Sequence, residues 1–105
     1  MAPSFDLYDL RVTVVEIKGR SVCGLKVGDY FEVTESSRIR LPAGQHFCIY
    51  ALQSALLLLP ARQRELDPAD WMAQDTLVAC PDPDEGLIMK IERIGRRSLN
   101  TGELT

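Results

Sequence analysis

The sequence predicts an α+β fold in which a small, mainly antiparallel sheet of about four strands packs on one main apolar helix. The evidence is short stretches rich in β-branched residues, one apolar stretch with helical spacing, and turn residues between them. Hydrophobic residues make up 46% and charged residues 26% of the 105 residues, which is a globular composition. We therefore expect a single domain, residues 1–105, with frayed ends at 1–9 and 96–105.

The first predicted strand, Leu10–Ile17, is rich in β-branched residues. Its side chains alternate between two faces, and we expect the buried face to consist of Thr13, Val15 and Ile17. Val12 and Val14 make the other face apolar as well, which is typical of a strand in the middle of a sheet.

The second predicted strand, Tyr30–Thr34, follows a loop and a tight turn at Val27–Asp29. The glycine in this turn supplies the conformational freedom that the turn requires. Phe31 and Val33 fall on one face of the strand, so we expect it to be half buried. Residues 36–45 contain a proline and a glycine and are predicted to be connecting chain.

A helix is predicted from residue 46 or 47 to Leu59, because apolar residues recur there at spacings of three and four. Nearly every turn of it is apolar, so we expect the sheet and a further partner to bury it. Pro60 should end or kink the helix, since its ring clashes with the carbonyl group four residues earlier. Asp67 as an N-cap predicts a short helical turn over residues 68–73.

The last predicted strands, Leu77–Cys80 and Leu87–Ile94, form a hairpin joined by the turn PDPDEG at residues 81–86. The two prolines restrict this turn and keep it from extending the sheet. Apolar and polar residues alternate at the start of the returning strand, and its apolar face consists of Leu87, Met89 and Ile91.

Charge and hydropathy argue against two kinds of partner. The net charge of −3 argues against nucleic acid, whose phosphates require a basic face. The longest apolar run, near ALLLLPA, is too short to span a bilayer, so no membrane partner is expected.

The first residues lack the pattern of a signal peptide, and three cysteines cannot form a complete set of disulfides. We therefore expect a cytoplasmic protein.

Cys23, Cys48 and Cys80 are the candidate site residues, and each lies near the end of a predicted element. Three thiolates and the imidazole of His46 would complete a tetrahedral site for zinc or iron. No C-x-x-C pair occurs, so tertiary structure would have to assemble such a site. The alternative is that the three thiols are small, buried packing residues.

The predicted topology suggests where these cysteines lie. We expect Cys48 and Cys80 to approach each other at one end of the sheet, because a helix begins near one and a strand ends at the other. Cys23 joins them if the first strand ends on the same side as the strand before Cys80. The start of a helix also stabilises a thiolate, which favours a reactive thiol at Cys48.

Other candidate sites have weaker support. Asp82, Asp84 and Glu85 would suit a hard cation, but acids in such a turn are more often solvated. No phosphate-binding loop, nucleophile elbow or metalloprotease motif occurs, and His46 has no evident orienting partner in the sequence. Trp71 is predicted to lie in the core or in an interface.

Four stretches of the chain resemble a family of small bacterial and archaeal proteins of about this length. They are VTVVEIKG, LKVGDYFEV after Cys23, LPAGQHFCIYAL and LVACPDPDEGLIMKIERI, and together they cover roughly residues 11–94. The resemblance implies a single cytoplasmic domain in which Cys23, Cys48 and Cys80 each match a cysteine of the family. It implies no particular reaction.

The chain departs from that family pattern at two places. Many members carry a second cysteine where Pro81 stands, and aromatic residues where Ile49 and Tyr50 stand. An activity that depends on the additional thiol is therefore not implied for this chain.

These observations lead to two hypotheses. The first is a non-catalytic accessory or binding protein that acts through a protein partner or as a homo-oligomer, because the helix over 47–59 is strongly apolar and no catalytic set is recognisable. The second is a thiol site at Cys23, Cys48 and Cys80 that binds a transition metal or takes part in redox chemistry.

Overall fold

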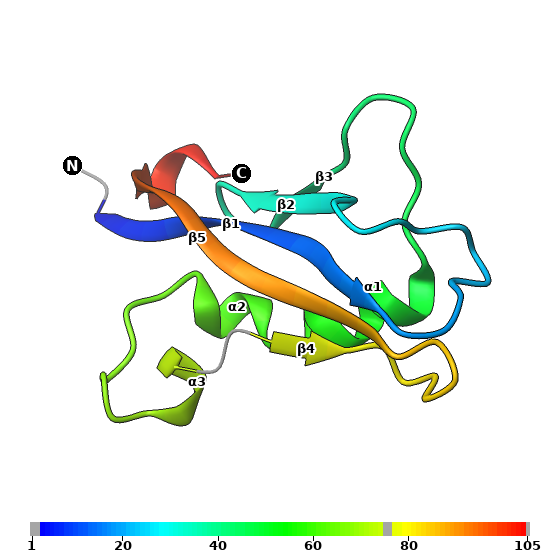
Figure 1. Cartoon of the computed structure of the whole chain (residues 1–105). Coiled ribbons are helices and arrows are strands. Elements are labelled where there is room, and N and C mark those ends of the chain that lie inside the picture. The colour runs from blue at the N-terminus through cyan, green and yellow to red at the C-terminus, as the bar shows by residue number, and fades with distance from the viewer. Residues whose placement is uncertain (1–2, 75–76, 105) are drawn as a thin grey trace.

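The computed structural model describes residues 3–74 and 77–104, and this part of the chain has an α+β fold (Figure 1). Its sheet has five strands in the order β3-β2-β1-β5-β4, and all neighbours are antiparallel. The strands are β1 (Ser4–Ile17), β2 (Tyr30–Thr34), β3 (Arg38–Arg40), β4 (Leu77–Ala79) and β5 (Leu87–Asn100). The helices are α1 (Ile49–Leu56), α2 (Leu59–Arg62) and α3 (Trp71–Gln74), and a 3-10 turn follows at Thr101–Glu103.

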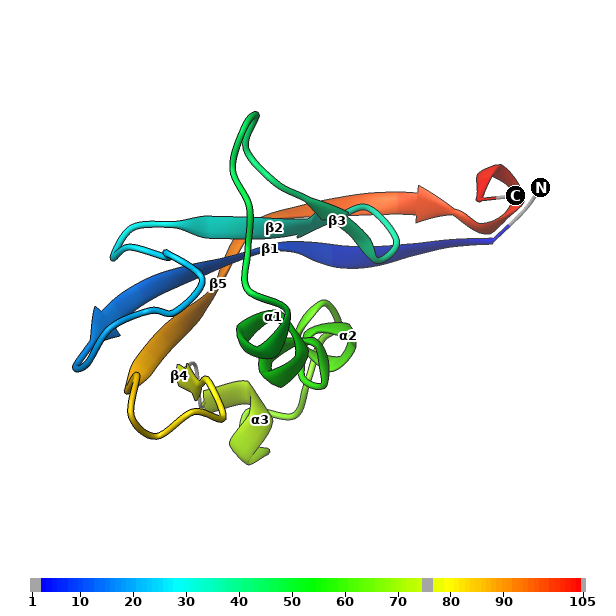
Figure 2. The ribbon, with the colours of Figure 1, turned by 90° about the vertical axis from the view of Figure 1, so that its right-hand side faces the viewer.

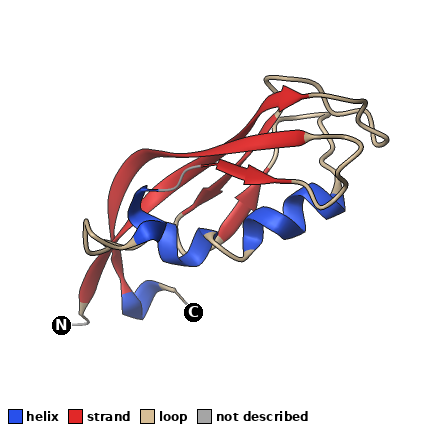
Figure 3. Cartoon of the chain, turned by 60° about the horizontal axis from the view of Figure 1, so that its bottom comes forward, coloured by secondary structure: helices blue, strands red, loops and turns tan. Residues whose placement is uncertain are grey.

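The helices α1 and α2 lie on one face of the sheet, as Figure 2 and Figure 3 show. Ala51, Ala55 and Leu59 of these helices belong to the core. They pack with apolar side chains of the three central strands, which are Leu10, Val12, Val14, Phe31, Val33, Leu87, Met89 and Ile91. The predicted α+β class and antiparallel sheet are confirmed, whereas the structure has five strands and three short helices in place of about four strands and one main helix.

The strand β1 lies in the middle of the sheet, as predicted, but the helices cover the opposite face from the predicted one. Val12 and Val14 are fully buried, whereas Val15 is 41% exposed. A register shift just after Val14 leaves Val15 unpaired in the register with β5. The prediction of a buried face at Thr13, Val15 and Ile17 is wrong, because both faces are apolar and the helices dock on the Val12 side.

The strands β1 and β5 pair from end to end, interrupted only by two register shifts. Both are longer than the predicted strands Leu10–Ile17 and Leu87–Ile94. The additional pairs join residues 4–9 to residues 95–100, and all of these residues except Gly95 lie within stretches that we expected to fray. The first two residues and the last residue of those stretches lie outside the described part of the chain.

Charged side chains connect these extended ends. Arg97 of β5 donates to both carboxylate oxygens of Asp9 on β1, the shortest distance being 2.5 Å. Arg96 pairs with Asp6 at 3.2 Å and lies over the ring of Tyr8. Pairs of opposite charge between neighbouring strands stabilise a sheet, and an apolar pattern does not reveal them.

The strand β3 pairs with β2, although the sequence predicted connecting chain there. Its three residues are all exposed, so no apolar pattern marks it. The preceding turn holds Glu35 and Ser37 at positive φ angles of 56° and 66°. Glu35 accepts a hydrogen bond from Arg40 at 2.7 Å and lies 3.5 Å from Arg38, so ion pairs support this edge strand.

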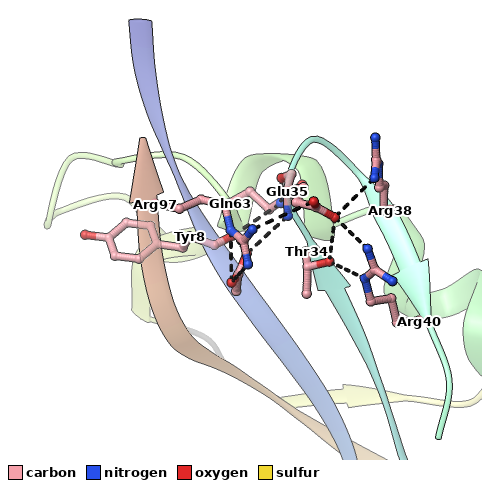
Figure 4. A network of polar contacts seen from close by, with 8 residues as sticks. Tyr8, Thr34, Glu35, Arg38, Arg40, Gln63 and Arg97 are labelled. Carbon is pink, nitrogen blue, oxygen red and sulfur yellow. Dashed lines mark hydrogen bonds and ion pairs between the residues drawn. The ribbon is translucent and has the colours of Figure 1, made fainter. Parts of the chain in front are cut away.

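Gln63, which follows α2, joins the helices to the sheet (Figure 4). Its side-chain Nε2 donates to the carbonyl oxygen of Tyr8 at 3.2 Å and to that of Glu35 at 3.0 Å. Its own carbonyl oxygen accepts from the backbone N–H of Tyr8 at 2.7 Å. Gln63 is only 1% exposed, so these bonds orient α2 against β1 from within the core.

The helix predicted from residue 46 or 47 begins later, at Ile49. Cys48 has an extended backbone, with φ −71° and ψ 130°. Phe47 packs edge-on against Phe31, with 4.9 Å between the ring centroids. This tertiary contact accounts for the later start, because it holds Phe47 and Cys48 outside the helix.

Pro60 divides the predicted helix into two. The helix α1 ends at Leu56, and Pro60 falls in the first turn of α2. A proline has no backbone N–H, so it fits the first turn of a helix, where that group has no partner within the helix. None of the helices in the described residues has the length and apolarity needed to cross a membrane.

The helical turn predicted after Asp67 is replaced by a turn and then by α3. The carboxylate of Asp67 accepts from the N–H of Ala69 at 2.8 Å, and that of Asp70 accepts from the N–H of Met72 at 3.0 Å. Asp70 therefore caps the helix instead of Asp67. Trp71 is 63% exposed, so it does not lie in the core.

Candidate functional site

A pocket of about 560 Å³ lies among three segments that gather at the end of the molecule opposite the two termini (Figure 1). The segments are the loop after β1, the chain at the start of α1, and the turn between β4 and β5. Their lining residues are Val22 and Cys23, residues 47–50, and Pro81, Asp82 and Glu85.

The turn at residues 81–86 is fixed against the end of β1. The N–H of Gly19 donates to the carbonyl oxygen of Glu85 at 2.8 Å. Within the turn, the carboxylate of Asp82 accepts from the N–H of Asp84 at 2.9 Å. Gly86 has a φ of 57°, a conformation that favours glycine. The predicted turn is therefore present, and it folds onto β1.

The loop after β1 is held by its own hydrogen bonds and by His46. The hydroxyl of Ser21 accepts from the N–H of Leu25 at 3.0 Å, and Leu25 is buried in the core. His46 Nε2 lies 2.7 Å from the carbonyl oxygen of Cys23. Because a carbonyl oxygen only accepts, this nitrogen carries the proton and donates. His46 thus ties the loop to the chain before α1.

Large apolar side chains are exposed at this pocket. Val22 is 75% exposed, and Ile49 and Tyr50 at the start of α1 are 71% and 62% exposed. Cys48, between Phe47 and Ile49, is buried and forms part of the wall. Exposed apolar side chains around a concave surface are typical of a binding site.

The structure places Cys23 and Cys48 in the wall of one pocket and buries Cys80 at the same end of the sheet. The strands β1 and β4 both pair antiparallel with β5, so they run in the same direction and end beside Leu87 and Ile88. We expected Cys23 to join the other cysteines only if β1 and β4 end on the same side of the sheet, and they do. Cys80 itself is not a lining residue, although Pro81 and Asp82 are.

The surroundings of two thiols favour their protonated form. Burial raises the pKa of the Cys23 thiol, and contact with Cys48 raises it further, while a hydrogen bond with Ser21 acts in the opposite direction. Burial also raises the pKa of Cys80, against the effect of a backbone hydrogen bond. A raised pKa disfavours the thiolate, which is the form that attacks electrophiles and binds metals.

No group of three or more His, Cys, Asp or Glu side chains that could hold a metal ion occurs in residues 3–74 and 77–104. His46, the predicted fourth ligand, is exposed and bonded through Nε2 to a backbone carbonyl. The described residues therefore add no support for a zinc or iron site at Cys23, Cys48, Cys80 and His46, which stays a prediction.

Glu85 lines the pocket, whereas sequence reasoning named it only with Asp82 and Asp84 as a weakly supported cation site. The acids of the turn were expected to be solvated, which holds for the exposed Asp84 and is wrong for Glu85. Glu85 is 6% exposed and lines the pocket, and its Oε1 has no hydrogen-bond partner in the described part of the chain. No sequence signal marks it, because an acid in a turn is normally exposed and only the packing of this turn on β1 buries it.

Comparison of the chain with protein-family models, with curated proteins and with solved structures finds no match. The family resemblance described from the sequence stays a prediction. The function proposed next rests on the geometry of the pocket.

Proposed function

We propose that the protein is a non-catalytic binding protein that takes a small, largely apolar molecule into the pocket beside Cys23 and Cys48. The observation that carries this proposal is the pocket of about 560 Å³. Small-molecule sites usually have volumes of roughly 300–1,000 Å³ and apolar walls with a few polar groups. Here only Asp82 and Glu85 among the lining residues are charged.

The exposed side chains at the pocket supply a source of binding free energy. Val22, Ile49 and Tyr50 keep apolar surface in contact with water. A ligand that covers about 200 Å² of such surface would contribute roughly 5 kcal/mol. Its own apolar surface would add to this, and the loss of translational freedom would offset part of it. We therefore expect dissociation constants in the micromolar range.

The surroundings of Cys23 and His46 support binding rather than catalysis. The raised pKa of Cys23 disfavours the thiolate that thiol chemistry requires. His46 Nε2 donates to a backbone carbonyl, so this nitrogen is not free to accept a proton from a thiol. The hypothesis of a thiol site for a metal or for redox chemistry stays a prediction, and the reactivity of Cys23 tests it.

The sequence also predicted a protein partner or a homo-oligomer acting through the apolar helix. Ile49 and Leu57, which are 71% and 81% exposed, leave apolar surface along α1 and its C-terminal end. That expectation and the cytoplasmic location stay predictions beside the small-molecule proposal.

Titration with a neutral apolar probe tests the proposal. N-phenyl-1-naphthylamine fluoresces more strongly in apolar surroundings, and it should bind saturably to one site in each chain. Ile49→Ser removes apolar lining from the pocket. It should weaken binding about fivefold, because about 1 kcal/mol of apolar contact is lost.

Leu57→Ser is the matched control. Leu57 is also an exposed apolar residue of the α1 segment, but it lies outside the pocket lining. This variant should bind the probe as the native chain does. The proposal would be overturned by a native chain without saturable binding, or by equal weakening in the two variants.

A further inference from the structure

We propose that Cys23 and Cys48 form a site of reversible modification, at which a neutral organic disulfide oxidises the two thiols to an intramolecular disulfide. The inference goes beyond the proposed function, because it does not require a bound ligand. It depends on the placement of the two thiols, on their unequal exposure, and on the position of the third cysteine.

Three observations place the thiols of Cys23 and Cys48 side by side. Both residues line the same pocket. His46 Nε2 donates to the carbonyl oxygen of Cys23 at 2.7 Å, which ties the backbone of Cys23 to the chain two residues before Cys48. The two thiols also contact each other, and both are free. A disulfide requires two side chains that approach each other closely, and this pair meets that requirement.

Cys80 is the competing partner, and the structure favours Cys23 over it. Cys80 is buried but does not line the pocket. Its sulfur accepts a hydrogen bond from the backbone of Asp82, which orients it toward the turn. Cys48 touches Cys23, whereas it acts on Cys80 only through its charge. We therefore expect the Cys23–Cys48 pairing among the three that are possible.

Exposure determines which thiol reacts first. Cys23 is half-buried, whereas Cys48 is only 8% exposed. A dissolved reagent therefore reaches Cys23 before it reaches Cys48. The apolar lining and the acids Asp82 and Glu85 disfavour an anionic reagent at this wall, so a neutral disulfide is the class that we expect to react.

The modification consists of two steps of thiol–disulfide exchange. In the first step, the thiolate of Cys23 attacks one sulfur of the reagent and breaks its S–S bond. One half of the reagent leaves as a thiolate and takes up the proton that Cys23 has lost, and the other half stays on Cys23 as a mixed disulfide.

In the second step, the thiolate of Cys48 attacks the sulfur of Cys23 and breaks the mixed disulfide. The second half of the reagent leaves and takes up the proton from Cys48. The two protein thiols together lose two electrons, and one molecule of reagent is reduced to two thiols.

The surroundings of the pair slow this exchange but stabilise its product. Burial and contact with Cys48 raise the pKa of Cys23, so little of its thiolate is present at neutral pH. A protein that stabilises its thiolate favours the reduced form, and its disulfide is easily reduced. The opposite holds at Cys23, so the cross-link should persist until a dithiol reductant reaches it.

Peptide mapping after oxidation tests this inference. The folded chain is treated in dilute solution at mildly alkaline pH with bis(2-hydroxyethyl) disulfide. Lys and Arg residues separate the three cysteines, so trypsin places each in a different peptide. Mass spectrometry without reduction should show the Cys23 and Cys48 peptides linked, at least about tenfold more often than either other pair. In urea all three pairs should form, because loop closure costs nearly the same for each.

Three variants assign the roles of the cysteines. Cys48→Ser should stop the reaction at the mixed disulfide on Cys23, since the second thiol is missing. Cys23→Ser should leave Cys48 largely unmodified, because Cys48 is buried. Cys80→Ser is the matched control and should form the cross-link as the native chain does. Circular dichroism checks that each variant is folded, and the peptide map of the native chain decides if one is not.

The cross-link should also stabilise the fold. It joins the loop after β1 to the start of α1, so we expect the melting temperature to rise by about 10 °C and to return to its original value after dithiothreitol. A lower melting temperature would show that the bond forms only by distorting the fold, and it would overturn the inference. A mixture of pairs like that in urea, a preference for Cys80, or a mixed disulfide that never proceeds to the cross-link would overturn it as well.

Discussion

Cys23 takes its chemical character from two neighbours. Its Sγ lies 3.7 Å from the hydroxyl oxygen of Ser21, and the thiol also contacts Cys48. Burial and Cys48 raise its pKa, and Ser21 only partly counters them. At neutral pH the thiolate fraction of Cys23 is therefore smaller than that of an exposed cysteine.

We predict that iodoacetamide alkylates Cys23 with a pH midpoint above that of the same cysteine in the unfolded chain. The thiolate is the reactive form, so a raised pKa moves the rate profile to higher pH. Mass spectrometry of the peptide that contains Cys23, after reaction in native buffer and in denaturant, measures the two midpoints. Cys48→Ala should lower the native midpoint, because it removes a neighbour that raises the pKa.

A native midpoint at or below the unfolded one would contradict this prediction. It would mean that the fold activates the thiol, and it would favour the hypothesis of a thiol site over that of a binding pocket.

The turn between β4 and β5 connects the fold to the pocket. It supplies Pro81, Asp82 and Glu85 to the lining, and it packs on the end of β1 at Gly19. A Cβ at Gly19 would meet the carbonyl oxygen of Asp84 at 2.0 Å. That oxygen belongs to the backbone, so only a shift of the whole turn would relieve the contact.

Gly19→Ala should therefore affect stability and binding together. We expect its free energy of unfolding to fall by about 1–3 kcal/mol, the usual effect of overpacking. The affinity for the neutral apolar probe should fall as well, because the turn that lines the pocket must move. Urea unfolding and probe titration measure the two effects.

Gly95→Ala is the control for this substitution. Gly95 lies in β5, and the nearest atom to an added Cβ is a carboxylate oxygen of Asp9 at 3.9 Å, which is an ordinary contact. We expect its stability to change by less than about 0.5 kcal/mol and its binding not to change. Equal effects of the two substitutions would show that the packing at Gly19 is not tight.

The molecule is long and flat, with extents of 52 × 36 × 18 Å. Its Cα radius of gyration is 14.9 Å, compared with about 13 Å for a compact domain of this size. The ribbon of β1 and β5 accounts for the difference, because it extends past the helices toward the termini (Figure 3). The pocket lies at the other end, where the loops gather.

We predict a gradient of amide protection along this ribbon. Val12 and Met89 lie in the core and should exchange only through global unfolding, whereas Phe5 and Leu99 near the termini should exchange through local opening. Hydrogen exchange followed by nuclear magnetic resonance in increasing denaturant distinguishes exchange through global unfolding from exchange through local opening. Exchange at Phe5 and Leu99 should depend little on denaturant, and equal dependence at all four amides would contradict the gradient.

Local sequence patterns predicted the elements whose own residues show clear side-chain alternation or turn chemistry. The strand β2 has the predicted bounds Tyr30–Thr34, and Phe31 and Val33 are buried as expected. The hairpin of β4 and β5 forms around the predicted turn at 81–86, and its buried face contains Leu87, Met89 and Ile91. These predictions succeeded because side-chain alternation and turn chemistry depend on neighbouring residues.

Tertiary contacts decided which apolar residues became core. The strand β1 is apolar on both faces, so the docking of the helices selected Val12 and Val14 over Val15. Phe47 and Cys48 have helical spacing, yet the contact of Phe47 with Phe31 keeps them outside α1. In each case the local sequence allowed two outcomes, either two possible buried faces or two possible helix starts. Packing against a distant segment determined which one formed.

Tertiary structure decided the lining of the pocket, although the order of the elements had predicted that Cys23 and Cys48 could meet at one end of the sheet. It joins residues 22–23, 47–50, 81–82 and Glu85, and these segments are far apart in the sequence. Glu85 has the sequence context of a solvated acid, and it is buried because the turn that contains it is bonded to Gly19 at the end of β1. The sequence by itself determined where the strands and turns form, since their signals are local. The site depends on contacts between distant segments, and no period or spacing in the chain records those contacts.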